Sequence, residues 1–412
     1  RLELLSLLVW VENTNTGDVS ECPGFRIWKY KKIWDLVCYN HEFCTIHKNL
    51  KHQYCYYQNL KKEAENSDII IINHSLLASC YNNNDSIIKN REICIIDEAH
   101  KLSDNCRSFL QESINIGYLK GLFESYNYIA SKITGNNSKN SSFSKLYEHS
   151  ELIKENMRLF LNEFNKMSIN VSEVKRKDNF NAISKVQDIR FLSDDKEFKD
   201  LDFPPITMVE SFDYLTSLLE NHRKLINNSN LDNCSKIDKI EYSISLNNLI
   251  GVKDILSRLF LNNNNKYVNW LTIYSNNNKT NSVTFNSAPL WVHELFNYLS
   301  IQFESMFLTS ATLTVNDSFD YVLDDLGLSN IMMNQNISTK KYFSPFLIND
   351  QLKLFVNDSN HDINSLDYIK SIYNLIKSIK INISKRILVL CTSYKQISDF
   401  KNLFNSDDSQ KN

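Results

Sequence analysis

The chain has 412 residues, of which 42% are hydrophobic and 23% are charged. This length allows two or three domains with sizeable cores, and the composition is that of a globular protein rather than a disordered one. No apolar run approaches the ~18 residues that a membrane span needs. The 46 Lys and Arg nearly balance the 48 Asp and Glu, so nucleic-acid binding would require a local basic patch.

Four short apolar runs predict buried strands of a parallel sheet, because each run is continuous rather than alternating. They cover residues 69–72, 93–96, 306–309 and 387–390. Polar or small residues follow each run directly. An open α/β sheet places its functional residues in such loops, at the carboxyl ends of its strands. The sequence therefore predicts an α/β fold with its chemistry at that edge.

Between the second and third runs, apolar residues recur at helical spacing. The two clearest stripes are Ile153, Met157, Phe160, Phe164 and Met167, and Leu246, Leu249, Val252, Leu256 and Leu259. This pattern predicts a helical insertion inside the α/β domain. Residues 267–274 and 283–285, joined by an Asn-rich turn, predict a hairpin at its end.

The second run ends in Asp97-Glu98-Ala99-His100. Adjacent carboxylates after a buried strand suit a nucleotide hydrolase, in which Asp97 would hold Mg²⁺ and Glu98 would polarise the attacking water. An arbitrary Asp-Glu pair is more often a polar turn. The four apolar residues before this pair, together with the whole DEAH string, favour the catalytic interpretation.

The third run is followed by Ser310-Ala311-Thr312. Small hydroxyl side chains at this position can hydrogen-bond the acidic cluster of a neighbouring strand and relay the state of a bound nucleotide. Taken alone, the string is also typical of an ordinary helix N-cap. Downstream of a DEAH strand it predicts coupling residues that act with His100.

In order and spacing, these motifs resemble those of superfamily 2 helicases. More narrowly they resemble the iron–sulfur XPD/DinG family of DNA helicases, and its bacterial DinG and YoaA branch in particular. Further segments that carry the resemblance are Thr16-Gly17-Asp18 with Ser20-Glu21, residues 67–77 with Asn73-His74, Ser287-Ala288-Pro289-Leu290, Ser344-Pro345-Phe346 and residues 388–394. The resemblance implies a RecA-like parallel-sheet motor domain, interrupted by a Cys-rich subdomain and a helical arch, and the start of a second RecA-like domain.

The implied domains follow the motifs along the chain. They are a Cys-rich, candidate iron–sulfur subdomain (1–66), the first motor domain with the DEAH box (67–112), the helical arch (113–266), the rest of the first motor domain with the Ser-Ala-Thr motif (267–335), and the start of the second motor domain (336–412).

The resemblance also implies a function, that of an ATP-dependent DNA helicase with ATP and Mg²⁺ as cofactors. Such a motor translocates on single-stranded DNA and unwinds duplexes, with forked or R-loop nucleic acid as substrates and a role in DNA repair or replication. We expect a monomer in the bacterial cytoplasm, associated with the nucleoid and not with a membrane. An RNA-directed DEAH-box enzyme and a non-catalytic nucleic-acid-binding remnant remain alternatives.

Two helicase motifs are not found in the sequence. No G-x-x-x-x-G-K-[ST] loop exists to cradle the phosphates, and no Arg-bearing last motif follows Tyr394. We expect both beyond the ends of this sequence, so that the chain is the central portion of a longer enzyme. The chain by itself is then expected not to hydrolyse ATP.

Four cysteines, Cys22, Cys38, Cys44 and Cys55, fall within 34 residues. Their spacing lacks the C-x-x-C of zinc ribbons, whereas four thiolates on separate loops can hold a [4Fe–4S] cluster. DinG-like proteins tend to carry C-x4-C-x5-C here. Cys44 and Cys55 fit its outer positions, but Asn49 occupies the middle one. Either Cys22 and Cys38 complete the ligand set, or the cluster is lost and the thiols are buried.

Residues 22–66 form a basic patch, with eight Lys or Arg against four Asp or Glu. Aromatic residues are interleaved with these charges. Cations beside stacking platforms suit single-stranded nucleic acid. The alternative is that the aromatic residues form the core of a small subdomain. The candidate nucleic-acid-binding residues are Lys29, Lys31, Lys32 and, through the resemblance, Asn73 and His74, although a structural role is the ordinary expectation for His74.

Overall fold

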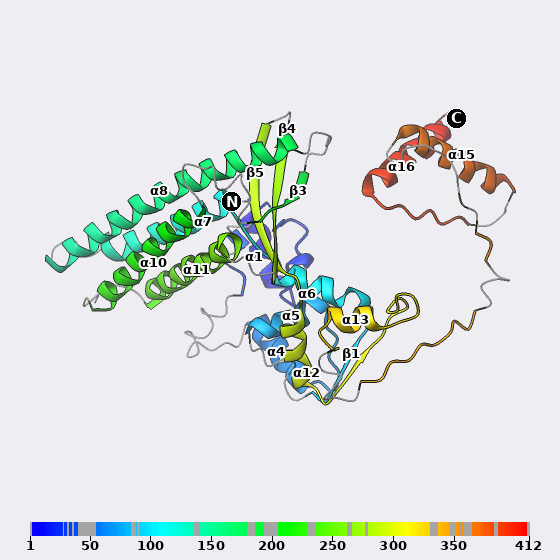
Figure 1. The fold of residues 1–412 in the computed structure, drawn as a ribbon, viewed down its shortest axis with the longest axis horizontal. Helices are drawn as coiled ribbons and strands as arrows, with labels where there is room; N and C mark the ends of the chain where they lie inside the picture. The colour runs from blue at the N-terminus through cyan, green and yellow to red at the C-terminus, as the bar shows by residue number, and fades with distance from the viewer. Residues whose placement is uncertain are drawn as a thin grey trace. The chain divides into compact units, whose positions relative to one another are not determined.

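A computed structural model of the chain divides into two compact units, Arg1–Ser338 and Thr339–Asn412. The structure describes residues 2–27, 29–30, 33–34, 37–39, 55–83, 88, 91–135, 141–178, 186–192, 205–228, 236–261, 266–276, 279–329, 337–346, 352–354, 356, 365–382 and 386–409. Figure 1 shows its elements in chain order.

Two parallel strands form the centre of the region that carries the DEAH sequence. Strand β1 (Ile93–Ile96) pairs with β6 (Ser305–Leu308), with Ile93 opposite Ser305 and Ile96 opposite Leu308. These strands confirm the predictions at 93–96 and, with a shift of one residue, at 306–309. The helices of this region are α5 (His74–Asn83), α6 (Leu102–Leu110), α12 (His293–Gln302) and α13 (Asp320–Asp325), and the 3-10 helix η4 (Ala99–Lys101) precedes α6.

The buried side chains around β1 and β6 form one hydrophobic core. They are Leu77, Ala78, Cys80, Ile88, Ile96, Ala99, Leu102, Cys106, Val292, Leu295, Phe296, Leu299 and Leu326. On β1 only Ile96 is buried, while Ile93 and Ile95 are exposed, as is Phe307 of β6. One face of the strand pair therefore packs against helices and the other is open.

The strand predictions at 69–72 and 387–390 were wrong. Both segments are described, and neither forms a strand with the described residues. Ile69 is 82% exposed and Ile71 is 93% exposed. A strand needs a hydrogen-bonding neighbour, and an apolar run by itself indicates a tendency to be buried, not a partner for pairing.

A four-stranded antiparallel sheet stands beside a helical bundle. Its order is β2-β5-β4-β3, with β2 (Glu112–Asn115), β3 (Val186–Arg190), β4 (Tyr267–Asn276) and β5 (Lys279–Pro289). The predicted hairpin is thus confirmed, and each of its strands extends past the predicted end, since Tyr267 pairs with Pro289 and Asn276 with Lys279. Figure 1 shows β3, β4 and β5 next to the long helix α8.

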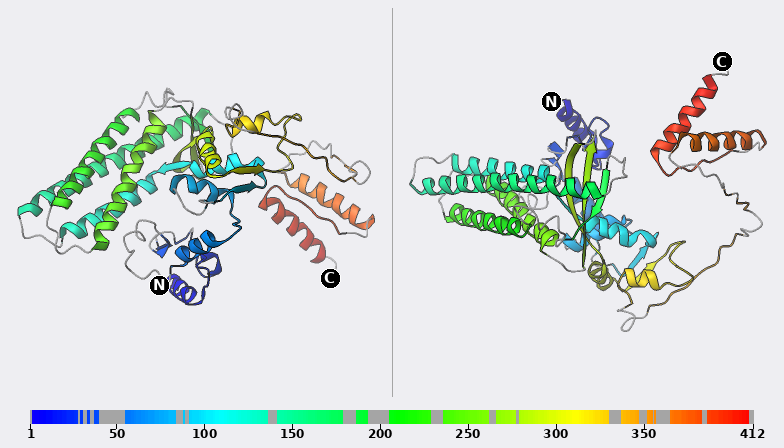
Figure 2. Two further views of the ribbon diagram at one scale, coloured as in Figure 1. Left: turned by 90° about the horizontal axis from the view of Figure 1, so that it is seen from below. Right: turned by 45° about the horizontal axis from the view of Figure 1, so that its top comes forward.

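The bundle consists of α7 (Ile116–Gly135), α8 (Ser141–Asp178), α10 (Pro205–Asn228) and α11 (Lys236–Phe260). Helices α7 and α10 each pack against both α8 and α11, and both views in Figure 2 show the four helices side by side. Every residue of the two predicted apolar stripes is buried, in α8 and in α11. Leu271, Ile273 and Phe285 of the hairpin join the same core.

The N-terminal segment contains α1 (Leu2–Asn13), the 3-10 helix η1 (Val19–Glu21) and α4 (Tyr56–Asn66). Gly17, with φ 72°, lies against Tyr56, and a Cβ atom at this position would come within 2.6 Å of the Tyr56 Cβ. Thr14 and Thr16 each donate a hydroxyl hydrogen bond of 2.6 Å to Glu21. These bonds hold the pKa of Glu21 below its usual value. The Thr-Gly-Asp and Ser-Glu segments are therefore parts of one turn.

The second unit contains α15 (Leu366–Asn382) and α16 (Tyr394–Ser409). Ile369, Tyr373 and Ile376 of α15 pack against Phe400 of α16. Ser344-Pro345-Phe346 is described and exposed, and forms no helix or strand.

Candidate active site

The two DEAH carboxylates lie in a loop that leaves the end of β1. The N–H of Thr309 donates to the carbonyl of Ile96 at 2.9 Å, and the carbonyl of Thr309 accepts from the N–H of Ala99 at 3.0 Å. Thr309 of the neighbouring chain segment thus makes both main-chain hydrogen bonds that flank the loop. Asp97 and Glu98, between the two bonded positions, are looped out and exposed.

Glu98 has a left-handed backbone, with φ 49° and ψ 41°. A non-glycine residue in this conformation costs about 1–3 kcal/mol and persists only where the surroundings enforce it. Here the next residue, Ala99, is buried and bonded to Thr309, and the N–H of Lys101 donates to the Glu98 carbonyl at 2.9 Å. The Glu98 N–H donates to Asp97 Oδ1 at 2.8 Å. The loop therefore fixes the Asp97 carboxylate and turns Glu98 outward.

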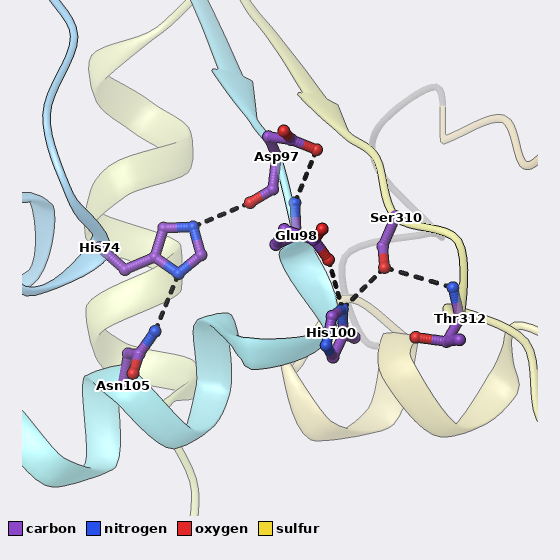
Figure 3. Close-up of polar contacts among 7 residues, drawn as sticks. All are labelled: His74, Asp97, Glu98, His100, Asn105, Ser310 and Thr312. Carbon is purple, nitrogen blue, oxygen red and sulfur yellow. Dashed lines mark hydrogen bonds and ion pairs between the residues drawn. The ribbon is translucent and has the colours of Figure 1, made fainter. Parts of the chain in front are cut away.

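His100 joins the DEAH loop to the turn after β6. Its Nδ1 lies 2.7 Å from Ser310 Oγ and 3.2 Å from Glu98 Oε2. The N–H of Thr312 donates to the same Ser310 Oγ at 3.2 Å. Figure 3 shows His100 between the carboxylate and the hydroxyl. The structure thus brings together the predicted residues of both motifs, although they are 210 positions apart. Ala311 is exposed in the turn between Ser310 and Thr312.

His74 contacts the other side of the DEAH loop. Its Nε2 lies 3.0 Å from the main-chain carbonyl of Asp97, and its Nδ1 lies 3.0 Å from Asn105 Nδ2. A carbonyl only accepts and an amide nitrogen only donates. His74 therefore carries a ring proton on Nε2, which donates to the Asp97 carbonyl. Sequence reasoning did not identify Asn105, which lies in α6 with no motif around it.

Asn73 has a local structural role. Its side-chain oxygen accepts the N–H of Leu76 at 2.8 Å, which caps the first turn of α5. This bond fixes the start of the helix on which His74 is the first residue. The prediction that Asn73 and His74 contact nucleic acid stays a prediction, with both side chains engaged within the protein.

Comparisons with known proteins identify the relatives of this site. The DEAD_2 family model matches residues 27–118. The chain is 27% identical to the 3'-5' exonuclease DinG of Bacillus subtilis, over 95% of this chain and 42% of that protein. It is 23% identical to the ATP-dependent DNA helicase YoaA of Haemophilus influenzae, over 98% of this chain and 56% of that protein. The chain contains a DEAD_2 domain and is a homologue of the DinG and YoaA proteins.

The match to the DEAD_2 domain covers the DEAH loop, His74 and Asn105, while the Ser310 turn lies outside it. The DinG protein of Staphylococcus saprophyticus is 23% identical over 97% of this chain, and again only 42% of its length is covered. The chain thus spans less than half of these DinG relatives.

The described cysteines between residues 22 and 55 give no support to the predicted four-ligand set. Cys22 is buried with Leu7 and Phe25, and its thiol donates to the Ser6 carbonyl at 3.5 Å. A thiol that packs in an apolar core and bonds a main-chain carbonyl does not fit a cluster ligand. Cys38 and Cys55 are half-buried, and Cys44 lies outside the described residues. The part of the chain that the structure describes contains no group of three or more His, Cys, Asp or Glu side chains able to hold a metal.

The basic patch is described only in part, because Lys31 and Lys32 lie outside the described residues. The Lys29 ammonium lies 5.0 Å from the centroid of the Tyr30 ring. Phe25 is buried, with its ring 6.1 Å from that of Trp34. Tyr39 and Tyr57 stack at 3.8 Å. Phe25 therefore belongs to a small core, as the alternative interpretation expected, and nucleic-acid binding by the patch stays a prediction.

None of the described helices is both long enough and apolar enough to span a membrane.

Proposed function

We propose that this chain is the central part of an ATP-dependent DNA helicase of the DinG and YoaA type. The motor would translocate on single-stranded DNA and unwind duplexes in DNA repair or replication. The observation that carries the proposal is the arrangement of the DEAH loop. The main chain of Thr309 brackets Asp97 and Glu98 at the end of β1, and His100 connects Glu98 to Ser310.

The roles of these residues follow from their chemistry. Asp97 offers an exposed, fixed carboxylate, the ligand type that Mg²⁺ uses together with nucleotide phosphates. Bound Mg²⁺ would neutralise charge that develops on the phosphates. Glu98 would accept a proton from the attacking water, and His100 with Ser310 and Thr312 would pass the state of the nucleotide toward the DNA.

The relatives' names support DNA as the nucleic-acid substrate and ATP as the nucleotide that is hydrolysed. The YoaA protein is named an ATP-dependent DNA helicase, and no relative cited above is named for RNA. The DinG proteins are named 3'-5' exonucleases, but the chain covers 42% of their length, and its own arrangement favours nucleotide hydrolysis. We assign the protein to the bacterial cytoplasm at the nucleoid, acting as a monomer on forked or R-loop substrates. A [4Fe–4S] cluster, with Cys22 outside its ligands, is left to direct assay.

Glu98→Gln in the longer protein that contains this chain tests the proposal. The substitution removes the base while keeping the side chain's shape, so ATP binding should persist and DNA-stimulated hydrolysis should fall at least a hundredfold. Glu304→Gln, at an exposed carboxylate just before β6, is the matched control and should retain wild-type turnover. The 412-residue chain alone should not turn over ATP. A Glu98→Gln protein that keeps more than about a tenth of wild-type kcat would contradict the assignment.

A further inference from the structure

The carbonyl of Asp97 takes no part in the hydrogen bonds between β1 and the chain segment after β6. The ladder bonds at the end of β1 go to Ile96 and Ala99, on either side of the DEAH loop. The partner of the Asp97 carbonyl is His74 Nε2, which reaches it from the first residue of α5.

We propose that His74 is a positioning residue for the Asp97 carboxylate, and that Asn105 sets its tautomer. This inference rests on the proposed function, in which Asp97 binds Mg²⁺. It differs from the family-based expectation that His74 touches nucleic acid.

Two hydrogen bonds control the Asp97 residue from opposite ends. The Nε2–H of His74 holds the carbonyl, and the Glu98 N–H holds the carboxylate Oδ1. Rotation of the peptide that follows Asp97 moves the Glu98 N–H, because both groups belong to that peptide unit. The bond from His74 therefore sets the direction of the donor that orients the carboxylate.

Asn105 makes His74 suitable for this role. Its amide nitrogen lies 3.0 Å from Nδ1 and can donate to it, which favours the tautomer with the ring proton on Nε2, where the Asp97 carbonyl accepts. Asn105 lies in α6, and His74 lies in α5. Figure 3 shows the chain of contacts from Asn105 through His74 to Asp97. Partners that orient a metal ligand typically change metal affinity or activity by 10–100-fold when they are removed.

The structure provides a matched control on α12. His293 Nε2 lies 2.9 Å from the main-chain carbonyl of Asp324, which is the same type of bond to the same type of residue, away from the DEAH loop. Both histidines are partly buried. A general loss of stability would appear in variants of either histidine, whereas a positioning effect would appear only in variants of His74.

The experiment uses the longer protein with ADP present and measures Mn²⁺ affinity by electron paramagnetic resonance, together with single-stranded DNA affinity. His74→Met removes the donor at similar length and should weaken Mn²⁺ binding about tenfold or more, with DNA affinity changed by less than about twofold. His74→Gln places an amide N–H the same number of bonds from Cα and should restore most of the affinity. Asn105→Leu should also weaken Mn²⁺ binding, but by a smaller factor than His74→Met. His293→Met should leave Mn²⁺ affinity unchanged.

Unchanged Mn²⁺ affinity in His74→Met would overturn the proposal, and so would an equal loss in His293→Met. A loss of DNA affinity with normal Mn²⁺ binding would overturn it in favour of a DNA contact at His74. Wild-type protein that binds no Mn²⁺ with ADP would instead contradict the proposed function itself, and the positioning role with it.

Discussion

The helical bundle and the DEAH region are stabilised by different kinds of interaction. The bundle encloses its own core, in which stripes from α8 and α11 meet the inner face of the β4–β5 hairpin. The DEAH region has two paired strands with Ile93, Ile95 and Phe307 exposed, and its carboxylates lie on a loop with a left-handed residue. Side-chain packing determines the structure of the bundle, whereas individual hydrogen bonds determine where the DEAH carboxylates lie. Core substitutions in the bundle should therefore change stability, and polar substitutions near β1 should change chemistry.

The largest effect on stability is expected from Phe212→Ala in α10. Phe212 is fully buried, and its ring lies 4.9 Å from that of Phe160 at 61°. Removing such a side chain leaves a cavity and should lower the free energy of unfolding of the bundle by about 3–5 kcal/mol, measured by urea denaturation.

Tyr214→Ala is the control on the same helix, since Tyr214 is 52% exposed. It should change the free energy of unfolding by less than about 0.5 kcal/mol. Equal effects from the two variants would mean that the core is not where the structure places it.

The next largest effect concerns His222, which is fully buried in the bundle. Its Nδ1 lies 2.7 Å from Tyr126 Oη and 2.9 Å from Tyr242 Oη. Burial, with a smaller contribution from nearby His149, lowers its pKa from 6.5 to about 4. The unfolded chain therefore gains a proton before the folded one does. Stability should be lost as the pH falls from about 6.5 to about 4, by roughly 3 kcal/mol in total.

His222→Gln does not titrate in this range, so urea denaturation at pH 7 and pH 4.5 should show a smaller difference for this variant than for the wild type. If both proteins lose the same stability on acidification, the bundle's pH dependence comes from other groups.

A smaller effect is expected at Cys22, and it separates packing from metal binding. Cys22→Ala removes a sulfur atom from the small core with Leu7 and Phe25, at a cost of about 1–2 kcal/mol. Any iron in anaerobically purified protein, seen as a brown colour with broad absorbance, should be retained in this variant. Cys44→Ser and Cys55→Ser should remove the colour if a cluster exists. Loss of iron in Cys22→Ala would show that Cys22 is a ligand of the cluster.

The smallest effect is expected from the ion pair of Glu155 and Arg158 on α8. Arg158 holds the pKa of Glu155 below its usual value, yet both side chains are mostly exposed. Exposed pairs are screened by solvent and contribute little. Glu155→Gln should leave the urea midpoint of the bundle unchanged within error, and a clear shift would mean that this helix surface is less open than its exposure indicates.

Periodicity and motifs predicted much of this molecule, because buried positions are occupied by apolar residues at the spacing of a helix or a strand. The stripe from Ile153 to Met167, the hairpin and the strand before Asp97 were all predicted correctly. Residues 69–72 were not, since an apolar run does not specify whether a neighbouring strand is present to pair with it.

The finer geometry of the site left no pattern in the sequence. Thr309 brackets the DEAH loop through its main chain, which any residue except proline can do, so its side chain carries no signal. Asn105 reaches His74 across 31 positions from an ordinary polar place on a helix. The contact of His100 with Ser310 was expected from the motifs, and the structure supplied its distance.

A double-mutant cycle on His100 and Ser310 tests most directly whether the DEAH loop and the Ser310 turn act as one unit. In the longer protein, DNA unwinding per ATP hydrolysed is measured for His100→Ala, Ser310→Ala and the double variant. Because the two side chains meet at 2.7 Å, each single variant should lower this ratio by about tenfold, and the double variant should be no worse than the more severe single one. Losses that simply add, or unwinding that stays at the wild-type level, would contradict coupling through this contact.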